Sequence, residues 1–145
     1  DDAATPGEVE RLAGLDAPAR AQVAAADTLF IASRHPASGV DVSHRGGAPG
    51  FVRVDDERTL TLPDYAGNFF FNTLGNLQVD PRAGLLFIDF ERGDLLHVAA
   101  TAALIRDGAE LAAFDGAQRL LRLTVDQVVR VTGGLPLAWV DVADR

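Results

Sequence analysis

The chain has 145 residues, which is the length of a single domain, and 48% of them are apolar, as in ordinary globular proteins. Its net charge of −8 opposes a nucleic-acid partner, and no apolar run reaches the ~18 residues of a membrane span. We therefore expect a soluble, cytoplasmic protein. The sequence has no Cys and no Lys, which excludes thiol nucleophiles, cysteine-bound zinc and Schiff-base chemistry.

Two helical signals open the chain. Thr5–Glu8 has the form of a capping box with Pro6 at the first helical position. Asp16 is a suitable N-cap for a second helix through the Ala-rich residues 17–26. These signals predict a helical N-terminal segment over residues 1–27, followed by the main unit over 28–145, within one domain overall.

From Thr28 onward the sequence alternates between short apolar runs and turn residues, a pattern typical of strands. A loop at 63–67 and a short helix over 68–79, ended by Pro81, interrupt this pattern. The connections are too short for helical crossovers, so the strands are expected to pair antiparallel. The prediction is a mainly β fold, a split β-barrel of six to seven mostly antiparallel strands with short flanking helices. The expected strands cover 29–32, 40–45, 51–54, 59–62, 83–90, 95–106 and 119–131.

Neither a catalytic residue nor a metal site follows from the side chains alone. Ser43 and His44 are adjacent on an expected strand, so they point to opposite faces and cannot act as nucleophile and base. The three histidines, His35, His44 and His97, do not have the spacing of metal ligands. We therefore predict no metal ligand and leave the catalytic residues open.

Two polar segments indicate a bound anion. Residues 41–47 place Arg45 and a hydroxyl beside two glycines, and a fixed guanidinium with exposed backbone N–H groups suits a phosphate. Residues 68–76 place three Asn and one Thr in the first turns of a helix, where N–H groups also bind anions. The alternative is an ordinary surface arginine and a capped helix. Both segments within one small barrel favour phosphate.

Five blocks in one order carry a resemblance to a known family. Together they span most of the chain, from about Asp27 to Trp139, and they resemble the pyridoxamine 5′-phosphate oxidase-like family of FMN-binding split barrels. The resemblance implies FMN as cofactor and a homodimer with two flavin sites at the subunit interface. The blocks are residues 41–47, 49–52, 63–68, 71–77 and 81–90.

The resemblance also implies which residues surround the flavin. The strand residues 43–46 would run beside it, with Arg45 toward the phosphate or the ring edge, and the following loop would border the isoalloxazine or the ribityl chain. The helix start would hold the phosphate, and the tail would approach the flavin of the partner subunit. The implied cofactor-binding residues are Ser43, His44, Arg45 and Gly46 on the strand, Tyr65, Gly67 and Asn68 in the loop, Asn72, Thr73 and Asn76 in the helix, and Trp139 in the tail.

One departure from the family pattern bears on function. True pyridoxamine-phosphate oxidases grip two phosphates with Lys and Arg and end in an Arg-x-His-type motif, whereas this chain has no Lys and ends in Val-Asp-Val-Ala-Asp-Arg after Trp139. We therefore expect an FMN-dependent oxidoreductase for an unknown small substrate or electron carrier, without the vitamin substrate site. The alternatives are a non-catalytic flavin-binding or storage module, the same barrel with haem or a deazaflavin coenzyme, and an apo structural dimer.

Overall fold

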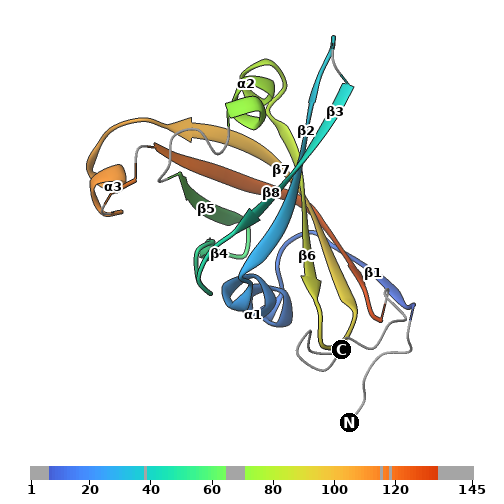
Figure 1. The fold of residues 1–145 in the computed structure, drawn as a ribbon. Coiled ribbons are helices and arrows are strands. Elements are labelled where there is room, and N and C mark those ends of the chain that lie inside the picture. The colour runs from blue at the N-terminus through green and yellow to red at the C-terminus, as the bar shows by residue number, and fades with distance from the viewer. Residues whose placement is uncertain (1–6, 38, 65–70, 115, 118, 134–145) are drawn as a thin grey trace, which may run out of the picture.

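The computed structural model describes residues 7–37, 39–64, 71–114, 116–117 and 119–133. In these residues eight strands and three helices follow one another along the chain (Figure 1). Their bounds are β1 Val9–Leu12, α1 Ala17–Ala25, β2 Thr28–His35, β3 Gly39–Gly46, β4 Arg53–Asp56, β5 Thr59–Asp64, α2 Phe71–Val79, β6 Arg82–Asp89, β7 Asp94–Ile105, α3 Ala109–Ala112 and β8 Arg119–Val131.

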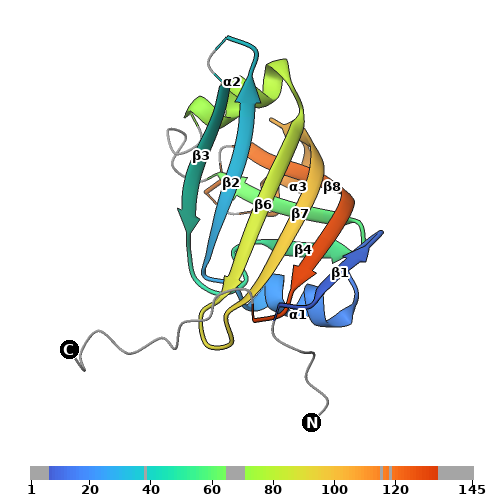
Figure 2. The same cartoon turned by 90° about the vertical axis from the view of Figure 1, so that its right-hand side faces the viewer.

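The strands form one coiled antiparallel sheet in the order β3-β2-β6-β7-β8-β5-β4, with β1 added on β8. The long strands β7 and β8 bend across the molecule, so that β4 and β5 lie opposite β2 and β3 (Figures 1 and 2). The helix α2 lies over one end of this sheet beside β2 and β3, and α1 lies at the other end. This arrangement confirms the predicted mainly β split barrel.

The N-terminal segment corrects one prediction and confirms another. The first expected helix is absent from its described part, because Val9–Leu12 form β1 and pair with β8. Glu10 accepts a hydrogen bond from Arg130 at 3.0 Å across this pairing, a long-range contact that local capping signals do not encode. The N-terminal segment is therefore part of the same sheet. The second helix forms as predicted, with Asp16 as its N-cap accepting from the Ala19 amide at 3.0 Å.

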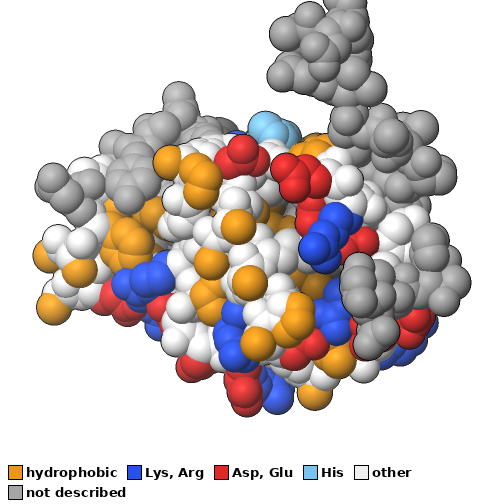
Figure 3. All heavy atoms as spheres, turned by 90° about the horizontal axis from the view of Figure 1, so that it is seen from below, with side chains coloured by type: hydrophobic (Ala, Val, Ile, Leu, Met, Phe, Trp, Pro, Cys, Tyr) orange, Lys and Arg blue, Asp and Glu red, His pale blue; other side chains and the backbone are white. Residues whose placement is uncertain are grey.

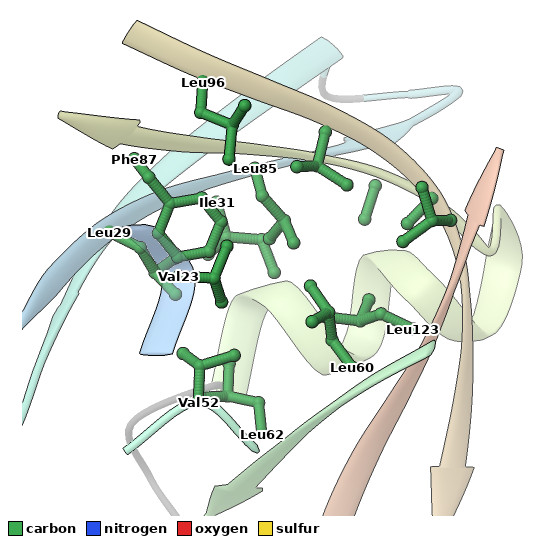
Figure 4. Packing of buried hydrophobic residues seen from close by; sticks show 14 of the residues in the cluster. Val23, Leu29, Ile31, Val52, Leu60, Leu62, Leu85, Phe87, Leu96 and Leu123 are labelled. Atoms are coloured by element: carbon green, nitrogen blue, oxygen red, sulfur yellow. The ribbon is translucent and has the colours of Figure 1, made fainter. Parts of the chain in front are cut away.

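The core fills the space between the two arms of the coiled sheet (Figure 4). Phe87 and Leu96 from one arm, and Leu60 and Leu123 from the other, are completely buried. Val23 of α1 is also fully buried and closes the core at its end of the barrel. Alternate residues of β2, β6 and β7 therefore face this core, as expected for strands with one side on a closed apolar interior.

The opposite side of β3, β2, β6 and β7 is called here the outer face. It is also apolar and forms a shallow hollow of about 390 Å³. In Figure 2 these strands lie side by side toward the viewer, and no described helix crosses in front of them. Val42 on β3 is 62% exposed there. The side chains of the outer face that line the hollow are Phe30, Ala32, Val42, Leu86, His97 and Ala99.

The surface at the α1 end of the molecule is mixed in charge. Seen from the α1 end, acidic and basic side chains alternate with scattered apolar ones, and neither sign forms a large patch (Figure 3). None of the described helices has the length and apolar character needed to cross a membrane.

The contact between Asp16 and Arg130 gives a first prediction. Arg130 binds both carboxylate oxygens of Asp16, at 2.9 and 2.8 Å, so Asp16 caps α1 and also ties it to β8. We expect Asp16→Ala to lower the free energy of unfolding by about 1–2 kcal/mol. Asp16→Asn keeps a cap acceptor and loses only the charge, so it should cost less. Urea unfolding of both variants measures this, and equal losses would show that the cap does not matter.

The same carboxylate makes the stability dependent on pH. The hydrogen bonds from Arg130 hold the pKa of Asp16 below the ordinary value for an aspartate. A depressed carboxylate pKa stabilises the fold above the unfolded-state value, and this contribution disappears as the pH falls through the lower folded-state value. Below about pH 4, the free energy of unfolding of Asp16→Asn should therefore fall less steeply with decreasing pH than that of the wild type. Urea unfolding between pH 3 and pH 6 measures this difference.

Candidate functional site

A group of polar side chains lies between α2 and the strands it covers. Among the described residues, the buried polar or charged ones are Ser33, Arg45, Thr61, Asp64 and Thr73. Ser33 and Thr73 belong to the contact of α2 with β2 and β3. Arg45 and Asp64 belong to a neighbouring group of charged side chains. We call the side chains Ser33, Ser43, Thr73 and Asn76 the α2 cluster.

Within the α2 cluster, a chain of hydroxyl groups joins the helix to β3. Ser43 Oγ lies 3.3 Å from a carboxylate oxygen of Asp41, to which it donates, and 3.2 Å from Thr73 Oγ1. A serine hydroxyl has only one proton, so Thr73 is the donor in the second contact. The direction of donation therefore runs from Thr73 through Ser43 to Asp41.

A second link lies one turn further along the helix. Asn76 donates from Nδ2 to Ser33 Oγ on β2 at 3.0 Å. The two links fix α2 to two neighbouring strands through polar groups, whereas Leu77 of the same helix is buried in the core. Ser43, Thr73 and Asn76 are among the cofactor-binding residues that the resemblance implies, and all three take part in these links.

Arg45 lies on the same side of β3 as Ser43 and is only 8% exposed. Its Nη1 donates to the carbonyl oxygen of His44 at 3.1 Å. Burial lowers the pKa of Arg45, and the negative charges of Asp64 and Asp41 partly offset this effect. The guanidinium therefore belongs to a buried charged group rather than to the open surface.

Asp64 is the centre of this charged group. It is 1% exposed, and its carboxylate forms an ion pair with Arg119 Nε at 3.2 Å. Asp64 ends β5 and Arg119 begins β8, and the two are direct partners in the sheet. The structure thus extends β5 by two residues into the segment 63–67 that was expected to be a loop.

His44 lies on the other side of β3 and does not join the α2 cluster. Its Nε2 forms a hydrogen bond with the hydroxyl of Thr28, and its ring is tilted against Phe30 with 5.4 Å between ring centroids. The structure therefore confirms that Ser43 and His44 face opposite ways and cannot form a catalytic pair. Any ligand that contacts Ser43 or Arg45 from inside meets a different surface from one that contacts His44.

The glycines after Arg45 are less available than the sequence indicated. Gly46 is the last residue of β3 and is paired with Thr28. The amide of Gly47 donates to the carbonyl of Asp27 at 3.0 Å, so this N–H is already used within the protein. A side chain at Gly47 would approach Phe51 to 2.9 Å, which gives this glycine a packing role.

Several predicted site residues cannot be placed. Tyr65, Gly67, Asn68 and Trp139 lie outside the described residues, and Asn72 is part of α2 with a side chain that is not described. Their assignment to the flavin stays a prediction.

Sequence reasoning missed three residues of the site, Ser33, Asp64 and Arg119. A signal for the two charged ones was present in the strand pattern. Asp64 has the same alternation phase as the buried Leu62, and Arg119 has the phase of the buried Leu121. Opposite charges in the phase of buried apolar residues, one of them just beyond an expected strand, indicate a buried ion pair.

Comparison with known proteins identifies the class of protein to which this chain belongs. Residues 15–132 match the model of the pyridoxamine 5′-phosphate oxidase family, so the chain belongs to this family. The match covers every described element except β1. A comparison with curated proteins gave no match.

Solved structures show the same fold at low sequence identity. A variant of HupZ from Group A Streptococcus is 13% identical, with a TM-score of 0.67 over 81% of this chain and 99% of that chain. An FMN-binding protein from Syntrophomonas wolfei is 12% identical, with a TM-score of 0.57 over 78% and 83% of the two chains. An F420 reductase is 14% identical, with a TM-score of 0.54 over 75% and 94%.

The hydroxyl chain gives a prediction that concerns α2 alone. Thr73→Val removes the buried donor and keeps the side-chain shape, so it should lower the free energy of unfolding by about 1 kcal/mol. Ser43→Ala removes the group that accepts this proton. If the two hydroxyls interact, the double variant loses less than the sum of the single losses, by about 0.5–1 kcal/mol. Strict additivity in urea unfolding would contradict the direct contact.

Proposed function

We propose that this chain binds FMN and acts as an FMN-dependent oxidoreductase on a small substrate or a second electron carrier. Membership of the pyridoxamine 5′-phosphate oxidase family supports the general class. The observation that carries the proposal is the α2 cluster, because it concentrates hydrogen-bonding side chains in the first turns of a helix beside a strand that holds an arginine.

The residues of the α2 cluster fit a phosphate group in their chemistry. Hydroxyl and amide side chains donate hydrogen bonds to phosphate oxygens, and the first turn of α2 adds the positive end of the helix dipole. Thr73 is the third residue of α2 and Asn76 the sixth. The two arginines nearby, Arg45 and Arg119, are balanced by Asp41 and Asp64. Phosphate binding would therefore depend mainly on the helix start and on the neutral donors, which would have to exchange their present bonds to Asp41, Ser43 and Ser33 for bonds to the phosphate.

Bound FMN would supply the hydride or electron transfer, and the protein would bind and orient it. Ser43 and Asn76 would hold the phosphate end, while the negative charge of Asp64 would help to orient Arg45 on β3. Arg45 would stabilise negative charge on the reduced flavin through its field. Because the negative charges of Asp64 and Asp41 partly offset that of Arg45, its net effect on the flavin would be smaller than that of an arginine without such neighbours.

The proposal includes a homodimer with the flavin sites between its subunits. The outer face supports a second copy as the partner, because an apolar sheet face of this kind is costly to leave in water. The chain carries a net charge of −8, yet the outward positions of β2, β3, β6 and β7 contain no Asp or Glu. Two copies can therefore meet through this face without bringing acidic groups together.

The absorption spectrum of the purified protein with added FMN tests the cofactor. Flavin bands at about one FMN per chain after removal of the excess would support the proposal. A folded dimer that leaves FMN unbound in a fluorescence titration would refute it. The same spectrum identifies haem by a Soret band. A second titration with a deazaflavin tests the remaining alternative, since binding of the deazaflavin in place of FMN would indicate the chemistry named for the F420 reductase.

A single variant tests the assigned phosphate end. Ser43→Ala should raise the dissociation constant of FMN about 10-fold, because a hydrogen bond to a charged group contributes about 1.5 kcal/mol or more. Thr59→Val is the matched control, since its hydroxyl lies at the start of β5 beside α1 and is bonded to the carboxylate of Asp56, away from α2 and from the outer face. Equal affinities for the wild type and Ser43→Ala would remove Ser43 from the site.

Steady-state turnover separates the enzyme from a flavin-storing module. An oxidoreductase consumes NADH, NADPH or another donor in the presence of an acceptor, whereas a storage module binds FMN without turnover. Reduction of the bound flavin by none of these donors would favour the storage function.

A further inference from the structure

One row of side chains crosses the outer face from strand to strand and contains two histidines. The backbone pairings place these side chains opposite one another on successive strands, about 4.8 Å apart. The middle of this row is a ridge made by Phe30, Leu86 and His97, which all line the hollow. The row runs through His44 on β3, Phe30 on β2, Leu86 on β6, His97 on β7, Val129 on β8 and Arg11 on β1.

The next row along the same strands is a trough. Ala32, Gly84 and Ala99 lie opposite one another on β2, β6 and β7, and they line the same hollow. A Cβ added at Gly84 would meet only the Ala32 side chain, at 3.9 Å, so the trough has room. Ridge and trough are about 7 Å apart along the strands. A two-fold axis through the face would place the ridge of each copy in the trough of the other, as an isologous interface requires.

His97 is the titratable member of this ridge, and its surroundings are neutral. Among the described residues of the same row, the nearest charge is Arg11, two strands and about 10 Å away beyond Val129. Arg82 on β6, Asp126 on β8, Arg34 on β2 and His44 on β3 are the further charged or titratable groups on this side. The immediate neighbours are Leu86, Gly84 and Ile88 on β6, Val129, Gln127 and Val131 on β8, and Leu95 and Ala99 on β7.

We propose that His97 makes the association of two copies sensitive to pH: neutral His97 is covered in the dimer, and protonated His97 drives the subunits apart. The inference rests on the homodimer proposed above and adds its regulation. A charged imidazole loses its hydration when a second apolar face covers it, and no acidic side chain of the outer face lies beside it to compensate. Histidine is the side chain that ordinarily changes charge between pH 5 and pH 8.

The sign of the effect follows from linkage. The dimer binds fewer protons at His97 than the separated subunits do, so its stability is greatest above the titration range of histidine and falls as the pH decreases. A symmetric dimer contains two such residues. Because two such residues gain a proton on dissociation, the dissociation constant of the dimer should rise as the pH falls, and we expect it to be at least about 10-fold higher at pH 5.5 than at pH 7.5. Flavin sites between the subunits would release FMN over the same range.

Sedimentation velocity at pH 7.5, 6.5 and 5.5 tests this inference, with circular dichroism to confirm that the subunits stay folded. His97→Leu should remain dimeric at pH 5.5. His97→Gln is a second variant that keeps a polar, neutral side chain, and its dissociation constant should not change with pH. The control is His35→Gln, because His35 ends β2 and accepts a hydrogen bond from the Ala37 amide in the turn; this variant should dissociate on acidification like the wild type.

The outcomes separate this inference from the proposed function. A wild-type monomer at pH 7.5, with FMN present, overturns the homodimer and the role of His97 together. A dimer that persists at pH 5.5, or that dissociates equally in His97→Leu and His97→Gln, overturns the role of His97 and leaves the homodimer intact. Loss of the pH dependence in His44→Gln, but in neither His97 variant, would assign the effect to the other histidine of the row.

Discussion

The structure depends on one constraint, which is that β2, β6 and β7 are apolar on both faces. Their inward side chains, such as Ile31 and Phe87, are completely buried in the core. Their outward side chains, such as Phe30 and Leu86, line a hollow that no described segment covers. A sheet of this composition is stable in water when both sides are covered, as in proteins whose sheets are buried on two faces. Folding covers one of these faces, and the proposed association would cover the other.

The edge strand β3 connects this constraint to the candidate site. Its residues alternate between the two sides of the sheet, so Ser43 and Arg45 face α2 and the charged group, while Val42 and His44 face outward. One strand thus contributes to the proposed phosphate end and to the proposed subunit contact. A shift of β3 would alter both surfaces at once, which gives a physical basis for coupling between association and cofactor binding.

The sequence predicted the elements whose signals are local. The bounds of β8 agree with the expected strand over 119–131, because apolar and polar residues alternate regularly there, and α1 begins at its predicted N-cap. The strand β1 was not predicted, because its pairing depends on the distant Arg130. Asp64 was missed for a similar reason, since its ion-pair partner Arg119 is 55 positions away and becomes its neighbour only when β5 pairs with β8.

The candidate site shows the same division between local and distant information. The polar character of residues 41–47 and of the helix start was evident from the sequence. The side of the sheet that each side chain faces, in contrast, is known only once β3 is paired with β2. The resemblance placed Ser43 and His44 together along the flavin, whereas the pleat of β3 separates them onto two surfaces. A ligand that contacts both residues must therefore pass around the exposed edge of β3. Among the described strands β3 pairs with β2 alone, so its other edge is the place where such a ligand would reach from the α2 cluster to the proposed subunit contact.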